Sequence, residues 1–155
     1  MNATVGTSVY GTLMKIALLL VSLLFAPLVQ AGDGWSEDYL GTMKQAKQAK
    51  KPLLLEFTGT KWCPPCIAFG KNVLSTEEFK NYAKEHFALA RVDFPDPLDF
   101  PEDKVELAKK YVAGDELRLP TVVVFDGAGK KLGQLNYSSG NAAKFIGELQ
   151  KIAGK

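Results

Sequence analysis

Hydrophobic and polar residues alternate in two different patterns along the chain from residue 35 onward. Over 35–50 the apolar residues recur at helical spacing, which predicts an amphipathic helix. Residues 53–57 read Leu-Leu-Leu-Glu-Phe, a nearly continuous apolar run that is typical of a strand buried on both faces. Extended along the chain, this reasoning predicts helices at 35–50, 67–74, 75–86, 102–112 and 141–152, and strands at 53–57, 88–93, 121–125 and 130–137.

The order of these elements favours an α/β fold with one mixed sheet. Strands 53–57 and 88–93 are separated by helices, and a strand–helix–strand unit implies parallel pairing. Strands 121–125 and 130–137 are joined by the turn Asp126-Gly127-Ala128-Gly129, which implies an antiparallel pair. We therefore expect a sheet of about four strands with helices on both faces, preceded by an extra N-terminal helix.

Residues 1–31 have the pattern of a secretory signal peptide. Lys15 is followed by the apolar run 16–25, and small residues stand at Val29 and Ala31. Cleavage is expected after Ala31, which places the protein in the periplasm or otherwise outside the cytoplasm.

The alternative for this segment is a membrane anchor. The apolar stretch 16–29 is shorter than the roughly 20 residues that span a bilayer, which favours the cleaved peptide. Met14 is a second candidate start of translation. The expected organisation is a signal peptide at 1–31 and one domain at 32–155.

Composition and charge exclude some classes of function. Hydrophobic residues make up 46% of the chain and charged residues 23%, which is typical of a packed domain. The formal net charge is +2, with acidic and basic residues interleaved, so nucleic acid is not expected as a partner. A domain of this size folds without disulfide cross-links.

The only two cysteines, Cys63 and Cys66, are separated by Pro64 and Pro65. Three uses are open. A structural disulfide would restrain the unfolded chain little, because the loop is so short. A metal site is disfavoured because zinc needs four ligands and His86 is the only histidine. A redox pair is the interpretation that the position of the cysteines favours.

Cys63 stands where a buried strand passes into a helix. Unsatisfied N–H groups and the helix dipole favour a thiolate there, and the thiolate is the attacking species. We therefore expect the sulfur of Cys63 to be exposed and partly ionised, with Cys66 placed to resolve a mixed disulfide. Pro64 and Pro65 each remove an N–H donor, so the thiolate is stabilised less and the pair is predicted to be reducing.

These segments resemble the thioredoxin superfamily over nearly all of residues 35–153. The sequence WCPPC at 62–66 is similar to its active-site motif, and LPT at 119–121 to its cis-proline loop. The segments FTG at 57–59 and STEEF at 75–79 are similar to those of exported members with an N-terminal helix. The resemblance implies a thioredoxin fold.

The resemblance also implies a role for each residue of the site. Cys63 is the nucleophile and Cys66 the resolving thiol. Trp62 shields the disulfide and touches the substrate. Pro120 is cis and packs against the sulfurs, and Leu119 offers its backbone to an extended substrate.

Glu56 corresponds to the buried acid of the family, which would take the proton from Cys66 during resolution. Burial is expected to raise the pKa of this carboxyl. Two features differ from the family, because the usual residue is Asp and the segment 58–61 makes the spacing to Cys63 one residue longer. The alternative is a glutamate that reaches solvent at the end of the strand.

Three surface features near the motif carry weaker expectations. The segment 112–118 is longer than usual before the cis-proline and is expected to tune the choice of partner. The proline-rich segment 94–101 is expected to be a connection, although an exposed Phe94 or Phe100 would contact a partner. Lys61 is expected to be a solvated lysine.

The predicted function is thiol-disulfide exchange on exported proteins, on the reducing side. An oxidising or isomerising exchange protein is the first alternative, and a non-catalytic dithiol metallochaperone for copper(I) is the second. No cofactor or resident metal is expected. The expected partners are disulfide-bearing exported proteins and a membrane electron donor, and the chain is expected to be a monomer.

Overall fold

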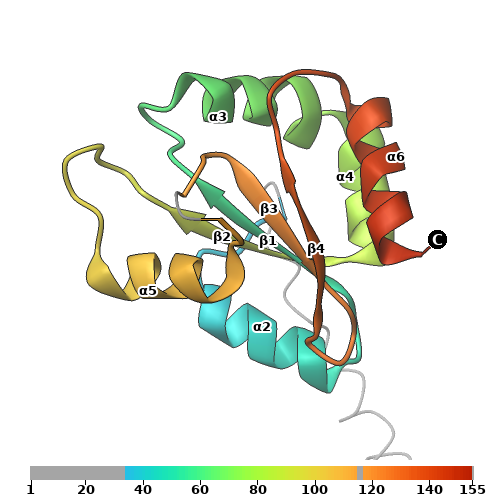
Figure 1. Cartoon of the computed structure of the whole chain (residues 1–155). Coiled ribbons are helices and arrows are strands. Elements are labelled where there is room, and N and C mark those ends of the chain that lie inside the picture. Colours follow the sequence, from blue (N-terminus) through green and yellow to red (C-terminus); the bar gives the residue numbers. More distant parts are fainter. Residues whose placement is uncertain (1–33, 115–116, 155) are drawn as a thin grey trace, which may run out of the picture. The chain divides into compact units, whose positions relative to one another are not determined.

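The computed structural model describes residues 34–114 and 117–154 (Figure 1). The predicted signal peptide, and residues 115–116 of the segment before the cis-proline, lie outside the described residues. The helices are α2 (Tyr39–Gln48), α3 (Pro64–Phe69), the π-helical segment η2 (Gly70–Leu74), α4 (Glu77–His86), α5 (Glu102–Tyr111) and α6 (Ala142–Ala153). The strands are β1 (Leu53–Thr58), β2 (Ala88–Asp93), β3 (Thr121–Phe125) and β4 (Lys131–Asn136).

The four strands form one mixed sheet in the order β2-β1-β3-β4. β1 pairs with β2 in parallel and with β3 antiparallel, and β3 pairs with β4 antiparallel. The predicted α/β class and mixed sheet are therefore confirmed. The central strands β1 and β3 are buried at every position, as their apolar runs predict.

Successive side chains of the central strands point to opposite faces of the sheet and pack in two separate hydrophobic cores. One core joins Leu54 and Val124 to α4 and α6, together with Phe69 of α3. The other joins Leu55 and Phe57 to α2 and α5. Figure 1 shows the resulting arrangement, with α3, α4 and α6 on one side of the sheet and α2 and α5 on the other.

The first helix begins later than predicted. The prediction of a helix from residue 35 is wrong for its first four residues, because α2 begins at Tyr39. Asp38 caps it by accepting a hydrogen bond from Gly41 N at 2.9 Å. Ser36 instead forms a parallel bridge with Ala90 of β2 and so covers part of an edge strand.

The helix that follows the cysteines begins earlier than predicted and changes its winding. It starts at Pro64 rather than residue 67, because proline is accepted in the first turn. From Gly70 to Leu74 it continues as a π-helix, and Ser75 N donates to Gly70 O at 2.9 Å. Among the described residues, none of the helices is long and apolar enough to cross a membrane.

Candidate active site

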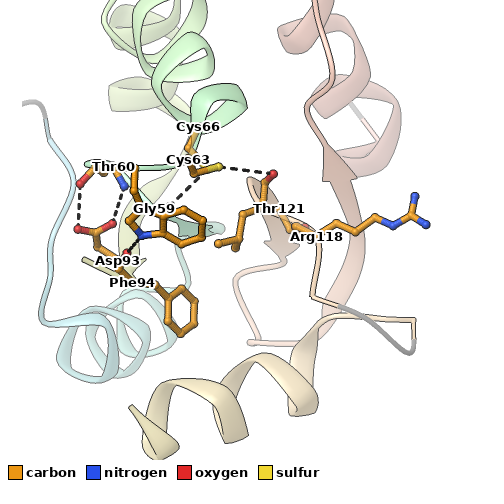
Figure 2. The surroundings of a disulfide bond; sticks show 10 residues. Gly59, Thr60, Cys63, Cys66, Asp93, Phe94, Arg118 and Thr121 are labelled. Atoms are coloured by element: carbon orange, nitrogen blue, oxygen red, sulfur yellow. Dashed lines mark hydrogen bonds between the residues drawn. A yellow bond between two sulfur atoms is a disulfide. The ribbon is translucent and has the colours of Figure 1, made fainter. Parts of the chain in front are cut away.

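The two cysteines lie at the C-terminal end of β1, where the chain passes from the sheet into α3 (Figure 2). Cys63 is the N-cap residue of α3, and Cys66 lies in its first turn. Their sulfur atoms are joined in a disulfide, with the two Cα atoms 5.2 Å apart. The structure therefore shows the oxidised form of the pair at the start of a helix.

The cysteine residues are less exposed than expected. Cys63 is 5% exposed and Cys66 is 3% exposed, so the expectation of an exposed residue 63 is wrong. The nearby backbone explains this burial, because Leu119 O lies 3.9 Å from Cys63 Sγ and Gly59 N lies 3.4 Å from Cys66 Sγ. The small exposed fraction restricts the directions from which a substrate sulfur can reach Cys63. The residues around the disulfide therefore help to decide which substrates react.

Few hydrogen-bond donors face the sulfurs. Pro64 and Pro65 occupy the first two positions of α3, and proline has no N–H group. Ile67 N is already used, since it donates to Cys63 O at 3.0 Å. Gly59 N, which lies 3.4 Å from Cys66 Sγ, is a donor from outside this turn. This arrangement agrees with the sequence argument that the two prolines limit stabilisation of a thiolate.

The backbone of the loop before Cys63 passes very close to the ring of Trp62. Gly59 O accepts a hydrogen bond from Cys63 N at 3.0 Å. A Cβ placed on Gly59 would lie 2.7 Å from Cε2 of Trp62, a distance that side chains do not tolerate. Glycine is therefore required at residue 59 for the backbone to pass the indole ring.

Asp93, at the end of β2, fastens the same loop to the sheet. Its carboxylate accepts hydrogen bonds from Thr60 N at 2.8 Å and from Thr60 Oγ1 at 2.9 Å. Lys104 of α5 donates from Nζ to Asp93 O at 2.7 Å. The extra residue in segment 58–61 is thus accommodated in a loop that is held at a defined point. Sequence reasoning missed Asp93, although its place at the end of the strand parallel to β1 was an available signal.

Trp62 is held beside the disulfide by the residue that follows Asp93. Its Nε1 donates to Phe94 O at 2.6 Å. Phe94 N in turn donates to Thr58 O at 2.9 Å and continues the pairing of β1 with β2. The indole ring meets the ring of Phe100 edge-on, with 6.1 Å between the ring centroids. Trp62 is therefore fixed in orientation by both a hydrogen bond and a ring contact.

The loop before β3 approaches the disulfide from a distant part of the sequence. The Leu119–Pro120 peptide bond is cis, as the resemblance implied. Thr121 Oγ1 donates to Arg118 O and accepts from Asn136 Nδ2 at 2.6 Å, which ties this turn to β4. The structure thus brings Leu119 to Cys63, a residue 56 positions earlier in the chain.

Glu56 is buried in β1 and forms an ion pair with Arg91 of β2. Arg91 Nε donates to Glu56 Oε2 at 2.7 Å. The guanidinium of Arg91 also lies over the ring of Trp35, 5.1 Å from its centroid. The alternative of a glutamate that reaches solvent is therefore wrong. Whether Glu56 exchanges a proton with Cys66 remains a prediction.

Potential metal-ligating side chains do not cluster in the part of the chain that the structure describes. In residues 34–114 and 117–154, no group of three or more His, Cys, Asp or Glu is placed to hold a metal ion. The disulfide occupies both thiols in this structure. The chemistry that the arrangement supports is exchange at the Cys63–Cys66 pair.

Comparison with known proteins assigns the class. The thioredoxin-like family profile matches residues 34–127. The "Disulfide bond reductase DsbH" of Chlamydia pneumoniae is 30% identical over 125 residues, which cover 80% of this chain and 75% of that protein. The chain therefore belongs to the thioredoxin-like family, and it is a thiol-disulfide oxidoreductase.

Two solved structures support the same assignment. The structure described as "DsbH Oxidoreductase" has a TM-score of 0.66 at 30% identity and covers 83% of this chain and 90% of its own. The solution structure of a thioredoxin from Thermus thermophilus has a TM-score of 0.59 at 26% identity. The match covers 76% of this chain and 85% of that thioredoxin chain. The predicted thioredoxin fold is thus confirmed.

Proposed function

We propose that this oxidoreductase reduces disulfides in exported proteins, in the periplasm or an equivalent compartment outside the cytoplasm. The observation that carries the proposal is the Cys63–Cys66 disulfide at the start of α3, with Leu119 O of the cis-proline turn 3.9 Å from Cys63 Sγ. The signal-peptide pattern of residues 1–31 supports the location. The relative named as a disulfide bond reductase supports the reaction.

The reaction begins from the dithiol form of the pair. The Cys63 thiolate attacks one sulfur of the substrate disulfide, which forms a mixed disulfide and releases the other substrate sulfur as a thiolate. The Cys66 thiolate then attacks the Cys63 sulfur, which releases the second substrate thiolate and forms the bond seen here. Two electrons pass to the substrate, and its two sulfurs take up two protons.

An extended substrate would be held by the backbone of the cis-proline turn. Leu119 O of this turn lies 3.9 Å from Cys63 Sγ, and a backbone edge beside the disulfide can pair with a peptide as an added strand. Trp62 precedes Cys63 and is fixed by its hydrogen bond to Phe94 O, and we propose that its ring shields the disulfide. Both groups bring the attacked sulfur to Cys63 and limit other approaches.

Glu56 is proposed as the proton acceptor for Cys66 in the second step. It lies on the same face of β1 as Leu54, and that face packs against α3 through Phe69. Arg91 Nε donates to its Oε2 at 2.7 Å, which fixes the orientation of the carboxyl group in the interior. We expect Glu56→Gln to slow resolution of a trapped mixed disulfide by about 100-fold, the lower limit for a general base.

The proposed reducing direction is supported by the chemistry around the sulfurs. Pro64 and Pro65 remove two donors that would stabilise a Cys63 thiolate, and a less stabilised thiolate means a less stable reduced form. The reduced form therefore gives up its electrons readily. To act repeatedly, the chain must regain two electrons from a dithiol donor, which we propose to be a membrane protein that carries electrons across the bilayer. The chain is proposed to work as a monomer.

Redox titration tests the direction. The purified domain is equilibrated in glutathione buffers, and the oxidised fraction is measured by alkylation of free thiols followed by mass spectrometry. We expect a midpoint of roughly −270 mV, near that of reducing thioredoxins, and a midpoint near −120 mV would assign the chain to the oxidants instead.

Insulin reduction tests the activity itself. The wild-type domain is expected to precipitate insulin chains in the presence of a dithiol, and Cys63→Ser is expected to abolish this turnover because it removes the nucleophile. Cys66→Ser is expected to accumulate the mixed disulfide. Turnover that survives in Cys63→Ser, or stoichiometric copper(I) binding without turnover, would favour the metallochaperone alternative.

A further inference from the structure

The segment 94–101 carries an exposed apolar surface beside the redox pair that the reaction described above does not use. Leu98 is 94% exposed and Phe100 is 40% exposed. Phe100 packs edge-on against Trp62, and Trp62 precedes Cys63 in the chain. Figure 1 shows this segment, between β2 and α5, projecting on the side of the molecule where β1 passes into α3.

The exposed side chains lie on a turn that is held by hydrogen bonds. Asp96 Oδ1 accepts a hydrogen bond from Leu98 N at 2.8 Å, and Asp96 forms an antiparallel bridge with Asp99. Phe100 stacks on the buried Phe94, with 4.9 Å between the ring centroids. Three prolines in the segment restrict its backbone further. The backbone at Leu98 is therefore held in place, so that binding has to order only the side chain.

The charged residues that flank Leu98 and Phe100 most closely in the sequence are acidic. Between residues 95 and 103 the sequence contains four acidic residues and no basic residue. Lys104 follows, but its Nζ is engaged with Asp93 O at 2.7 Å. An apolar surface with an acidic rim is complementary to a segment that carries both an apolar and a basic side chain. The acidic residues are Asp96, Asp99, Glu102 and Asp103.

We propose that residues 94–101 form a substrate-selecting arm of the reductase. The inference rests on the proposed function. The arm binds an extended segment of the disulfide-bearing protein that has an apolar residue beside the reacting cysteine and a basic residue beyond it. The apolar side chain packs on Leu98 and Phe100 while the cysteine reaches Cys63. A second copy of this chain fits the surface poorly, because a two-fold contact would bring the same acidic residues together.

Two peptide substrates test the arm directly. Each carries one cysteine in a mixed disulfide with glutathione, and they differ only in the two residues beside it, Leu and Lys in one and Ser and Glu in the other. Rates of reaction with the reduced domain are measured by stopped-flow tryptophan fluorescence. We expect the wild type to prefer the Leu-Lys peptide by about tenfold, and Leu98→Ser to reduce this preference to about twofold.

Two further variants test separately whether the acidic residues of the arm matter and whether an exposed leucine elsewhere has the same effect. In Asp99→Asn/Glu102→Gln, we expect the Leu-Lys peptide to react more slowly and its salt dependence to weaken, because two carboxylates are lost. Leu132→Ser removes a leucine that is 41% exposed on β4, and it should keep the wild-type preference.

Each outcome decides a different question. A Leu98→Ser protein with the wild-type preference would overturn the arm while leaving the reductase intact. A wild type that reduces neither peptide nor glutathione disulfide would overturn the proposed function, and the arm with it. A wild type that sediments as a dimer and becomes monomeric in Leu98→Ser would assign the surface to self-association and overturn the arm.

Discussion

Glu56 on β1 and Arg91 on β2 form an ion pair in the interior, and we expect the stability of the fold to depend on keeping the two charges together. The carboxylate is buried, and Arg91 Nε donates to it at 2.7 Å. Removing one member takes away an opposite charge that lies 2.7 Å from the other. We expect Glu56→Gln to lower the free energy of unfolding by about 3 kcal/mol, measured by urea denaturation.

A paired substitution separates the charge from the packing. Glu56→Met/Arg91→Met removes both charges together, and we expect it to recover most of the stability that Glu56→Gln loses. A double variant as unstable as the single one would show that the pair contributes through its shape or through the contact of Arg91 with Trp35. Slow resolution of the mixed disulfide in the stable double variant would then be attributable to the lost proton acceptor.

Tyr82 of α4 illustrates the cost of burying a hydroxyl. Its OH is buried and has no hydrogen-bond partner among the residues that the structure describes. Burial raises the pKa of Tyr82 above the ordinary value of 10.0. We expect Tyr82→Phe to be more stable by up to about 1 kcal/mol at pH 7, because it removes a desolvated polar atom and keeps the ring contacts with His86 and Phe87.

The sign of the pH dependence follows from this raised pKa. Below pH 10 the phenol is neutral in both folded and unfolded chains, and above pH 10 the unfolded chain loses its proton first. The wild type should therefore lose stability relative to Tyr82→Phe as the pH rises above 10, in urea titrations at pH 7 and pH 10.5. Tyr137→Phe is the control with the opposite effect at pH 7, because Tyr137 OH donates to Gly140 O at 2.9 Å. A clearly less stable Tyr82→Phe would contradict the argument.

Between elements, the contact of Asp93 with Thr60 joins the end of β2 to the loop that carries the motif. Two hydrogen bonds, at 2.8 and 2.9 Å, reach one carboxylate from one residue. We expect Asp93→Ala to lower the free energy of unfolding by about 1 to 2 kcal/mol and to speed amide hydrogen exchange at residues 59–61. Asp93→Asn keeps an acceptor and should have less than half of both effects.

Asp126 provides a matched control for this prediction. Its carboxylate accepts two backbone hydrogen bonds in the turn between β3 and β4, from Ala128 N at 2.8 Å and Lys130 N at 2.9 Å. Asp126→Ala should lower stability by a similar amount while amide exchange at residues 59–61 stays at the wild-type rate. Equal exchange in the two alanine variants would show that the carboxylate of Asp93 does not hold the loop.

The sequence predicts elements better than it predicts contacts between them. The strand at 88–93 has the predicted limits, and the helix 102–112 ends one residue earlier than predicted, because apolar periodicity is a local property. Asp38 decides where α2 begins, but residues 35–38 also fit the helical pattern. The hydrogen bonds of Asp93 to Thr60 span 33 positions, and no local pattern reveals them.

The burial of Cys63 could not be predicted for the same reason. The position of Cys63 at a helix start is local and was predicted correctly. Its exposure depends on Leu119, whose approach is set by a strand that enters the sheet more than fifty positions later. A helix start with two prolines suggests a surface, whereas the fold brings a second backbone segment against it.

Across the complete domain, the redox state and the stability of the fold are linked. The disulfide closes a loop over only two residues, so it restrains the unfolded chain little. Any large stability difference between the oxidised and reduced domain must therefore arise because the folded site stabilises one redox form of the cysteine pair more than the other. The donors left by Pro64 and Pro65 are few, which disfavours the reduced, partly ionised form in the folded state.

The proposed reducing character then has a measurable consequence for unfolding. For this two-electron couple, each 30 mV by which the folded pair is more reducing than the unfolded pair stabilises the oxidised fold by about 1.4 kcal/mol relative to the reduced fold. We expect the oxidised domain to unfold at a higher urea concentration than the reduced domain, with Cys63→Ser unfolding at one concentration in both redox buffers. A reduced domain that is the more stable of the two is the behaviour of strong oxidants, in which the site stabilises the thiolate, and it would contradict the proposed direction of electron flow.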